Sequence, residues 1–299
     1  MKFWLSLVAV REMEQLAQLA RCAEDLGFHG LMVGDHLIWP AHITTPYPYS
    51  ADGKIFVPPD TPWPDPWVLF AHLGAITQRL QFASNIYLAA LRDPLTVAKS
   101  VASAAVLTGN RVVCGVSAGW LREEYELAGV DFELRGRRLD ETLLVMRKLF
   151  SGQVVKHEGP LFRFEGIMCP APTQPVRIWC GGAAAPAMRR AARHDGWLPL
   201  PMTVAQADTA LAAIHIMRRD AGLPPSGFEV GLPLAEPVTQ AAVDAVQELG
   251  VHDLVVIAPW LPSPWDPNTW LERGEDMAQL AVKKRALERY AEAVLRRVH

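Results

Sequence analysis

Asp35 and His36 are the first residues of the chain whose types and spacing point to chemistry. They follow a short apolar segment, His29–Gly34, which predicts a buried strand, and Trp39 comes three residues after the histidine. A histidine beside an aspartate can accept, donate or relay a proton near neutral pH. A bare Asp-His pair is more often a solvated turn, so its place in the fold decides between the two interpretations. At a strand end that opens into a site, we predict that both residues act in catalysis.

A glycine pair marks a second candidate site. The segment Val176–Cys180 predicts a buried strand, and the turn Cys180-Gly181-Gly182-Ala183 leads from it into a helix over Ala184–Arg193. Glycines at a helix start expose backbone N–H groups, and the helix dipole favours an anion there. The turn therefore predicts anion binding, although many tight connections need glycine for geometry alone. Two arginines of this helix could assist, but their positions favour solvated side chains: Arg189 and Arg190.

Small residues also follow the apolar segment Arg111–Val116. The turn Ser117-Ala118-Gly119 would let a ligand approach the backbone closely, and Trp120 adds a large aromatic surface. An acidic pair, Glu123-Glu124, comes next, and an Arg-Gly-Arg-Arg run begins at Arg135. We expect this stretch to form part of the same site.

All three candidate groups lie at the C-terminal ends of predicted strands. A helical segment follows each predicted strand, and the strands are Phe3–Val10, His29–Gly34, Leu80–Ala90, Val112–Val116, Val176–Cys180, a strand from Asp195, Phe228–Leu234 and Asp253–Ile257. This alternation predicts the α/β class and a (β/α)₈ TIM barrel, with residues 1–299 forming a single domain. Active sites of such barrels lie at the C-terminal strand ends. The alternative is an open doubly wound sheet, which would need a glycine fingerprint that Val8–Arg11 lacks.

Two segments depart from the alternation. The loop Leu37–Pro64 is rich in aromatic residues and proline, and its length predicts a functional wall or lid. The stretch Val154–Phe164 predicts a small hairpin on the outside. A second loop rich in tryptophan and proline follows the last strand, and we expect a long helix from Trp270 to Arg297.

Composition narrows the partners and the compartment. The net charge is −3, without a basic bias, which argues against nucleic acid and anionic membranes as partners. The short N-terminal apolar run has no cleavage site and predicts a strand instead of a signal peptide. The cysteines have no metal-binding spacing, so we predict no metal site and expect buried, reduced thiols in a cytoplasmic protein: Cys22, Cys114, Cys169 and Cys180.

The stretch Thr108–Leu143 resembles the bacterial luciferase-like superfamily of flavin and deazaflavin enzymes. The resemblance rests on the strand, the small-residue turn, Trp120, the acidic pair and the Arg-Gly-Arg-Arg-x-x-Glu helix start. It extends from Phe3 to about Trp197. It implies a TIM barrel of the luciferase-like type with a small hairpin insertion, and a homodimer.

The resemblance also implies roles for individual residues. It implies a non-proline cis peptide between Asn85 and Ile86, next to Ser84, behind a flavin-type ring. Asp35 would lie near that ring, and His36 near the reacting carbon. Some relatives have a catalytic glutamate in the turn at Ala118 and Gly119, and its absence here favours His36 as the acid/base. The remaining implied cofactor contacts are the backbone turn Ser117, Ala118, Gly119 and a phosphate grip at Cys180, Gly181, Gly182 and Ala183.

The function that these residues and the resemblance together predict is coenzyme F420-dependent oxidoreduction. A hydride would pass between the deazaflavin and a small apolar organic substrate, with Trp39 and Trp120 in the substrate pocket. The alternative is an FMN-dependent monooxygenase that uses oxygen. Two further alternatives are a non-redox barrel enzyme acting on a phosphorylated metabolite and a barrel that binds ligand without turnover.

Overall fold

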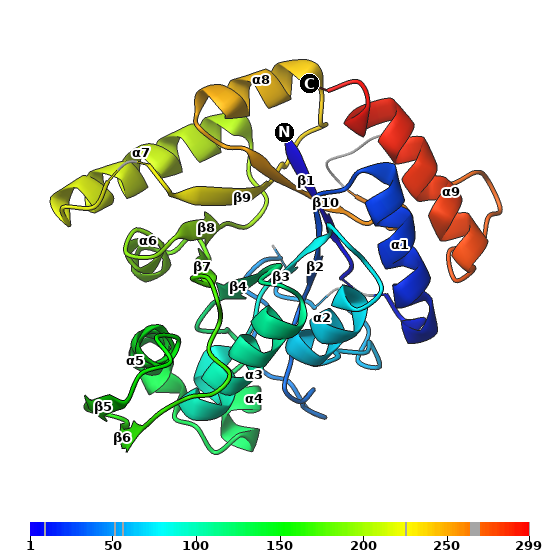
Figure 1. Ribbon diagram of the computed structural model, residues 1–299. Coiled ribbons are helices and arrows are strands. Elements are labelled where there is room, and N and C mark those ends of the chain that lie inside the picture. The colour runs from blue at the N-terminus through cyan, green and yellow to red at the C-terminus, as the bar shows by residue number, and fades with distance from the viewer. Residues whose placement is uncertain (9, 51, 56, 225, 264–269, 299) are drawn as a thin grey trace.

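A computed structural model describes residues 1–8, 10–50, 52–55, 57–224, 226–263 and 270–298. In this part of the chain, parallel strands close into a barrel in which each strand lies beside its neighbours in the chain order (Figure 1). This confirms the predicted (β/α)₈ barrel. Its strands are β1 Lys2–Ser6, β2 Gly30–Val33, β3 Gln81–Ser84, β4 Val112–Val116, β7 Arg177–Gly181, β8 Gly196–Leu198, β9 Glu229–Pro233 and β10 Asp253–Ile257.

Helices surround the barrel, and the C-terminal helix lies beside the first one (Figure 1). Short 3₁₀ turns at Met13–Gln15, Ala89–Leu91 and Phe132–Leu134 supplement them. The α-helices are α1 Leu16–Leu26, α2 Pro66–Gly74, α3 Pro94–Leu107, α4 Arg122–Leu127, α5 Arg135–Leu149, α6 Ala185–Ala191, α7 Val204–Asp220, α8 Gln240–Glu248 and α9 Leu280–Tyr290.

Local signals in the sequence explain where several helices begin and end. Asp93 caps α3 because its carboxylate accepts hydrogen bonds from the N–H groups of Leu95 and Thr96, and Pro94 occupies the first turn. Gly27 ends α1 with a φ of +93°, which a residue with a side chain rarely adopts. These boundaries set the lengths of the connections that reach the barrel mouth.

Two tryptophans fill the barrel interior and close its N-terminal half. The rings of Trp4 and Trp179 meet edge to face with centroids 5.5 Å apart, and both side chains are fully buried. Their N–H groups donate to Asp253 and Glu229 at 2.8 and 2.9 Å, so neither buried indole leaves an unsatisfied donor. A Cβ at Gly30 would lie 2.4 Å from the Trp4 ring, so the neighbouring strand β2 needs a glycine at this position. With this end packed, the open end is the C-terminal one.

The predicted hairpin is present and lies outside the barrel beside α5 (Figure 1). Its strands are β5 Val155–Glu158 and β6 Arg163–Gly166, which pair antiparallel. His157 is buried, and its Nε2 lies 3.1 Å from Oε1 of Glu141 on α5. This contact fixes the hairpin to the barrel wall.

Three predicted element boundaries are wrong. Strand β1 ends at Ser6 and not at Val10, and Ala9 lies outside the described residues. Strand β3 ends at Ser84, because the next two residues leave the ladder before Tyr87 pairs again with Val116.

The C-terminal helix begins at Leu280 and not at Trp270. Upstream of it, Gly274 has a φ of +87°, and the carboxylates of Glu275 and Asp276 accept local backbone N–H groups, which favours turns over helix. A π-helical turn, Ala291–Leu295, then follows α9.

The cysteines are free thiols with different exposure. Cys114 and Cys180 are buried as expected, whereas Cys22 is half-buried and Cys169 is exposed, so the expectation of four buried thiols is wrong. Among the described helices, none is long and apolar enough to cross a membrane.

Candidate active site at the barrel mouth

A cavity of about 660 Å³ opens at the C-terminal ends of β2, β3, β4, β7 and β8. The loop 37–64 and the start of α5 complete its walls. Most of the residues predicted for the site line it together: Asp35, His36, Trp39, Asn85, Ile86, Ser117, Ala118, Gly119, Trp120, Gly181, Gly182 and Ala183. The barrel thus brings the three candidate groups of the sequence to one place.

Two residues predicted to contact the cofactor lie outside this lining. Ser84 is fully buried, and its hydroxyl donates to the carbonyl of Gly115 at 2.8 Å. Cys180 is also fully buried, in the apolar core. The residues before them, Ala83 and Trp179, point into the barrel interior, so by alternation these two side chains point away from it, and the cavity wall is formed by the residues that follow, Asn85 and Gly181.

His36 is held on several sides. Its Nδ1 lies 2.9 Å from Oε2 of Glu124, a carboxylate with 1% of its side chain exposed. The imidazole also meets the rings of Trp39 and Trp63 edge-on, with centroids 4.9 Å away in each case. Nε2 forms no hydrogen bond with the described part of the protein, so it is the ring nitrogen left for a ligand.

Asp35 is paired on both carboxylate oxygens. Arg92 binds it in a bidentate pair at 2.7 and 2.8 Å, and the N–H of Leu88 donates to Oδ2 at 3.0 Å. Burial raises the pKa of the Asp35 carboxyl, and the hydrogen bonds and charge of Arg92 oppose that effect. The pair ties the end of β2 to the segment after β3. Both carboxylate oxygens of Asp35 are therefore occupied by protein donors, whereas His36 keeps one ring nitrogen available.

The long loop after β2 is fastened to α4. Oε1 of Glu123 accepts from the N–H and hydroxyl of Thr44 at 2.7 Å each and from the N–H of Thr45 at 2.9 Å. Burial acts to raise the pKa of Glu123, but these hydrogen bonds outweigh it and lower the pKa to about 2. The fastened loop presents Tyr47 to Trp120, with ring centroids 5.1 Å apart.

The chain leaves β7 through a turn made of small residues. Gly182 has a φ of +105°, and a Cβ at Gly181 would lie 3.1 Å from the side chain of Ile86 across the cavity. Helix α6 follows directly, and no side chain of a described residue caps it. Nearby, Arg135, Arg190 and Glu133 line the cavity at this end.

Arg190 corrects the expectation of a solvated side chain. It is 9% exposed, and its guanidinium donates to the Asp140 carboxylate at 2.6 Å and to the Gly136 carbonyl at 3.2 Å. These bonds link α6 to α5 across the edge of the cavity. An isolated Arg-Arg pair in a helix carries no signal for this, because the partner lies 50 residues earlier.

Other functional neighbours were not singled out from the sequence. Arg92 has a usable signal, since an arginine directly before the Asp-Pro start of a helix stands at a loop that reaches the mouth. Trp63 has none beyond the aromatic character of its loop. Glu124 belonged to the recognised motif, but its partner His36 lies 88 residues away, so no local pattern reveals the contact.

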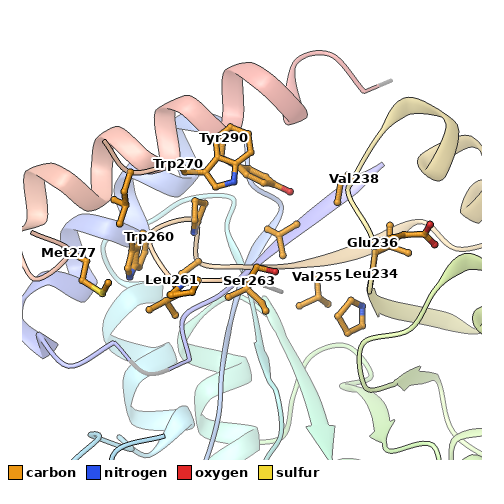
Figure 2. Close-up of a pocket in the computed structure, with 17 residues that line it drawn as sticks. Leu234, Glu236, Val238, Val255, Trp260, Leu261, Ser263, Trp270, Met277 and Tyr290 are labelled. Atoms are coloured by element: carbon orange, nitrogen blue, oxygen red, sulfur yellow. The ribbon is translucent and has the colours of Figure 1, made fainter. Parts of the chain in front are cut away.

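A second cavity of about 330 Å³ lies at the ends of β9 and β10, beside α9 (Figure 2). Trp260, Leu261, Trp270 and Tyr290 make most of its wall apolar. Part of the loop after β10, which is rich in tryptophan and proline, lies outside the described residues at positions 264–269. None of the residues predicted for catalysis or cofactor binding lines this cavity.

Known proteins match the chain over nearly its whole length. The family described as luciferase-like monooxygenase matches residues 3–296. The chain belongs to the luciferase-like monooxygenase family. It is therefore an oxidoreductase of the luciferase-like type, as the resemblance implied.

Individual relatives of this luciferase-like chain include proteins with and without a named activity. A protein of Mycobacterium tuberculosis named only as uncharacterised is 35% identical over 281 residues, 94% of each chain. The F420-dependent glucose-6-phosphate dehydrogenase of Nakamurella multipartita is 29% identical over 189 residues, 62% of this chain and 51% of that enzyme. The coenzyme F420-dependent tetrahydromethanopterin reductase of Methanopyrus kandleri shares the fold, with a TM-score of 0.72 at 13% identity and coverage of 100% and 99%.

Proposed function

We propose that this protein is a coenzyme F420-dependent oxidoreductase that transfers a hydride between the deazaflavin and an apolar organic substrate. The observation that carries the proposal is His36, which lines the barrel-mouth cavity with one ring nitrogen bound to Glu124 and the other available. The match to a relative named as an F420-dependent dehydrogenase supports the choice of cofactor.

The residues of the cavity fit a planar ring with a phosphorylated tail. The peptide between Asn85 and Ile86 is cis, as the resemblance implied, and both residues line the wall. Gly119, with a φ of +73°, and Gly181 line neighbouring walls without adding a side chain to them. Gly182 and Ala183, with Arg135 and Arg190, would hold the phosphate end through N–H groups and positive charge. The bound deazaflavin would supply the acceptor or donor of the hydride.

The protein would handle the proton that accompanies the hydride. His36 is the group suited to this task, because a neutral imidazole with one bound nitrogen offers a single lone pair at the other. Asp35 would hold the β2 end in place through Arg92 instead of exchanging protons, since its oxygens are already occupied. This modifies the prediction of a catalytic role for both residues.

The proposed substrate is apolar because the cavity walls away from the arginines are aromatic. Trp39 and Trp63 are stacked with an interplanar angle of 12°, and Tyr47 packs against Tyr49 and Trp120. Burial raises the pKa of Tyr47 to about 12, so its hydroxyl stays neutral at physiological pH. A charged substrate would lose its hydration against these walls without gaining a partner.

An FMN-dependent monooxygenase is the second candidate. It is favoured by the family description and by the turn Ser117-Ala118-Gly119, which offers no carboxylate at the end of β4. The ring cradle and the phosphate end suit both cofactors. We also propose a homodimer, which light scattering of the purified protein would test, with a monomeric mass as the contradicting result.

Equilibrium titrations of the purified apoprotein with F420 and with FMN, followed by chromophore fluorescence, test the cofactor. Preferential binding of F420 is the expected result. His36→Ala should leave that binding within about threefold of wild type, and His42→Ala, at an exposed histidine of the same loop, is the matched control. Preference for FMN would favour the monooxygenase, and binding of neither cofactor would refute the redox proposal.

A further inference from the structure

Two neighbouring carboxylates on α4 face the mouth of the barrel. Glu123 fastens the loop through Thr44 and Thr45, whereas Glu124 reaches inward to His36. Glu124 is 0% exposed as a residue, and a carboxylate in such a place needs donors to offset its lost hydration. Its strong donors are the backbone N–H of Leu37, at 2.6 Å from Oε1, and Nδ1 of His36, at 2.9 Å from Oε2.

The contact fixes which ring nitrogen of His36 carries the proton. A carboxylate only accepts, so the Nδ1 that faces it must be an N–H. In the neutral imidazole this leaves Nε2 with its lone pair, on the side of the ring that Glu124 does not occupy. The Leu37 bond holds the carboxylate at the backbone next to the histidine, and the Trp39 and Trp63 rings limit rotation of the imidazole.

Other charged groups near His36 do not compete for it. The Asp35 carboxylate is bound by Arg92 and Leu88, and the Glu123 Oε1 atom is bound by Thr44 and Thr45. Glu124 is therefore the group that interacts with the histidine, and it would also stabilise the imidazolium that forms when Nε2 takes up a proton.

We propose that Glu124 is the positioning residue that selects the Nδ1–H form of His36 and makes Nε2 the proton acceptor. The catalytic part of this inference rests on the proposed function, but the tautomer part does not. For oxidation of an alcohol, the O–H proton would pass to Nε2 while the carbon gives its hydride, with both electrons, to the deazaflavin. The C–H and O–H bonds break and a carbonyl forms. Reduction of the carbonyl compound is the reverse.

The test is nitrogen-15 NMR of the histidine-labelled apoprotein, with His36→Gln used to assign the resonances. In wild type, Nδ1 of His36 should show the shift of a protonated ring nitrogen and Nε2 that of an unprotonated one. In Glu124→Gln the amide oxygen cannot accept from both Leu37 and His36, so the Nε2 resonance should move towards the protonated value. Glu126→Gln, on the exposed face of the same helix, should leave both resonances unchanged.

A wild-type spectrum with Nε2 protonated and Nδ1 unprotonated would overturn the proposal even if Glu124→Gln failed to fold. An unchanged His36 spectrum in a folded Glu124→Gln protein would overturn it as well. An F420 titration on the same samples separates the two proposals. If the wild-type protein does not bind F420, the proposed function is refuted. The nitrogen-15 spectrum of His36 decides the role of Glu124 independently of that result.

Discussion

Replacing Arg92 by methionine should destabilise the protein severely, because it leaves Asp35 as an unpaired charge. In the pair, 1% of the Asp35 side chain and 12% of the Arg92 side chain are exposed. Methionine keeps an apolar stem against the Tyr87 ring, which the Arg92 guanidinium overlies at 4.4 Å. Breaking a buried pair from one side costs about 3–5 kcal/mol. That is a large part of the roughly 5–15 kcal/mol that stabilises a typical domain.

The assay is denaturant unfolding at pH 7.5 and pH 5, compared with Lys156→Ala. Lys156 forms an ion pair with Glu158 at 2.9 Å, but about two thirds of each side chain is exposed, so that variant should lose less than about 1 kcal/mol. The Arg92→Met loss should be smaller at pH 5. Burial raises the pKa of Asp35, and without the guanidinium protonation can relieve the charge as pH falls.

A double variant, Asp35→Asn with Arg92→Met, checks the cause. It should be more stable than Arg92→Met alone at pH 7.5, because it no longer buries a charge. If Arg92→Met lost no more free energy of unfolding than Lys156→Ala, the bidentate pair would not organise the β2 end as argued above.

Three further outcomes follow from the structure. Burial and the nearby Arg147 lower the pKa of His194 to about 4 in the folded state, so the unfolded chain binds the extra proton first. Unfolding free energy should therefore fall between about pH 6.5 and 4, and His194→Gln should flatten that slope; equal slopes would contradict this. Glu123→Ala removes the acceptor of the Thr44 and Thr45 hydrogen bonds, so a protease should cut the loop 37–64 faster than in wild type. The Glu126→Ala variant should be cut at the wild-type rate. Gly115→Ala should yield little folded protein, because its Cβ would lie 1.9 Å from the Ser84 carbonyl oxygen, whereas Gly166→Ala meets nothing within 4 Å and should fold normally.

The barrel could be predicted from the sequence because its strands are buried on both faces. Such strands appear as continuous apolar runs, and the helices between them carry their own start and stop residues, such as Asp93 and Gly27. The ends of β1 and β3 were placed too late, because apolar composition continues where the chain already leaves the ladder. After Ser84 and Asn85 the sequence is apolar again, from Ile86 to Ala90, yet Asn85, Ile86 and Leu88 line the cavity instead of extending the strand.

The catalytic candidate was found for a similar reason, whereas its partners were not. The end of a strand is a local property, so Asp35 and His36 could be placed at the mouth from their own neighbourhood. Their partners are Arg92 and Glu124, which are 57 and 88 residues away. Which polar groups meet across a mouth depends on barrel closure and on the path of each loop, and one sequence encodes neither in a local pattern.

The distribution of these partners nevertheless follows a physical rule. A carboxylate that closure removes from water must meet a donor, and the donors within reach stand on the segments that leave adjacent strand ends. Asp35 after β2 meets Arg92 from the segment after β3, and Glu124 from the segment after β4 reaches back to His36. The interior tryptophans obey the same requirement at the opposite end, where Trp4 donates to Asp253 on the neighbouring strand. When a barrel is predicted from sequence, the partner of a charged residue at the end of a strand can therefore be sought first in the segments that follow the next two strands.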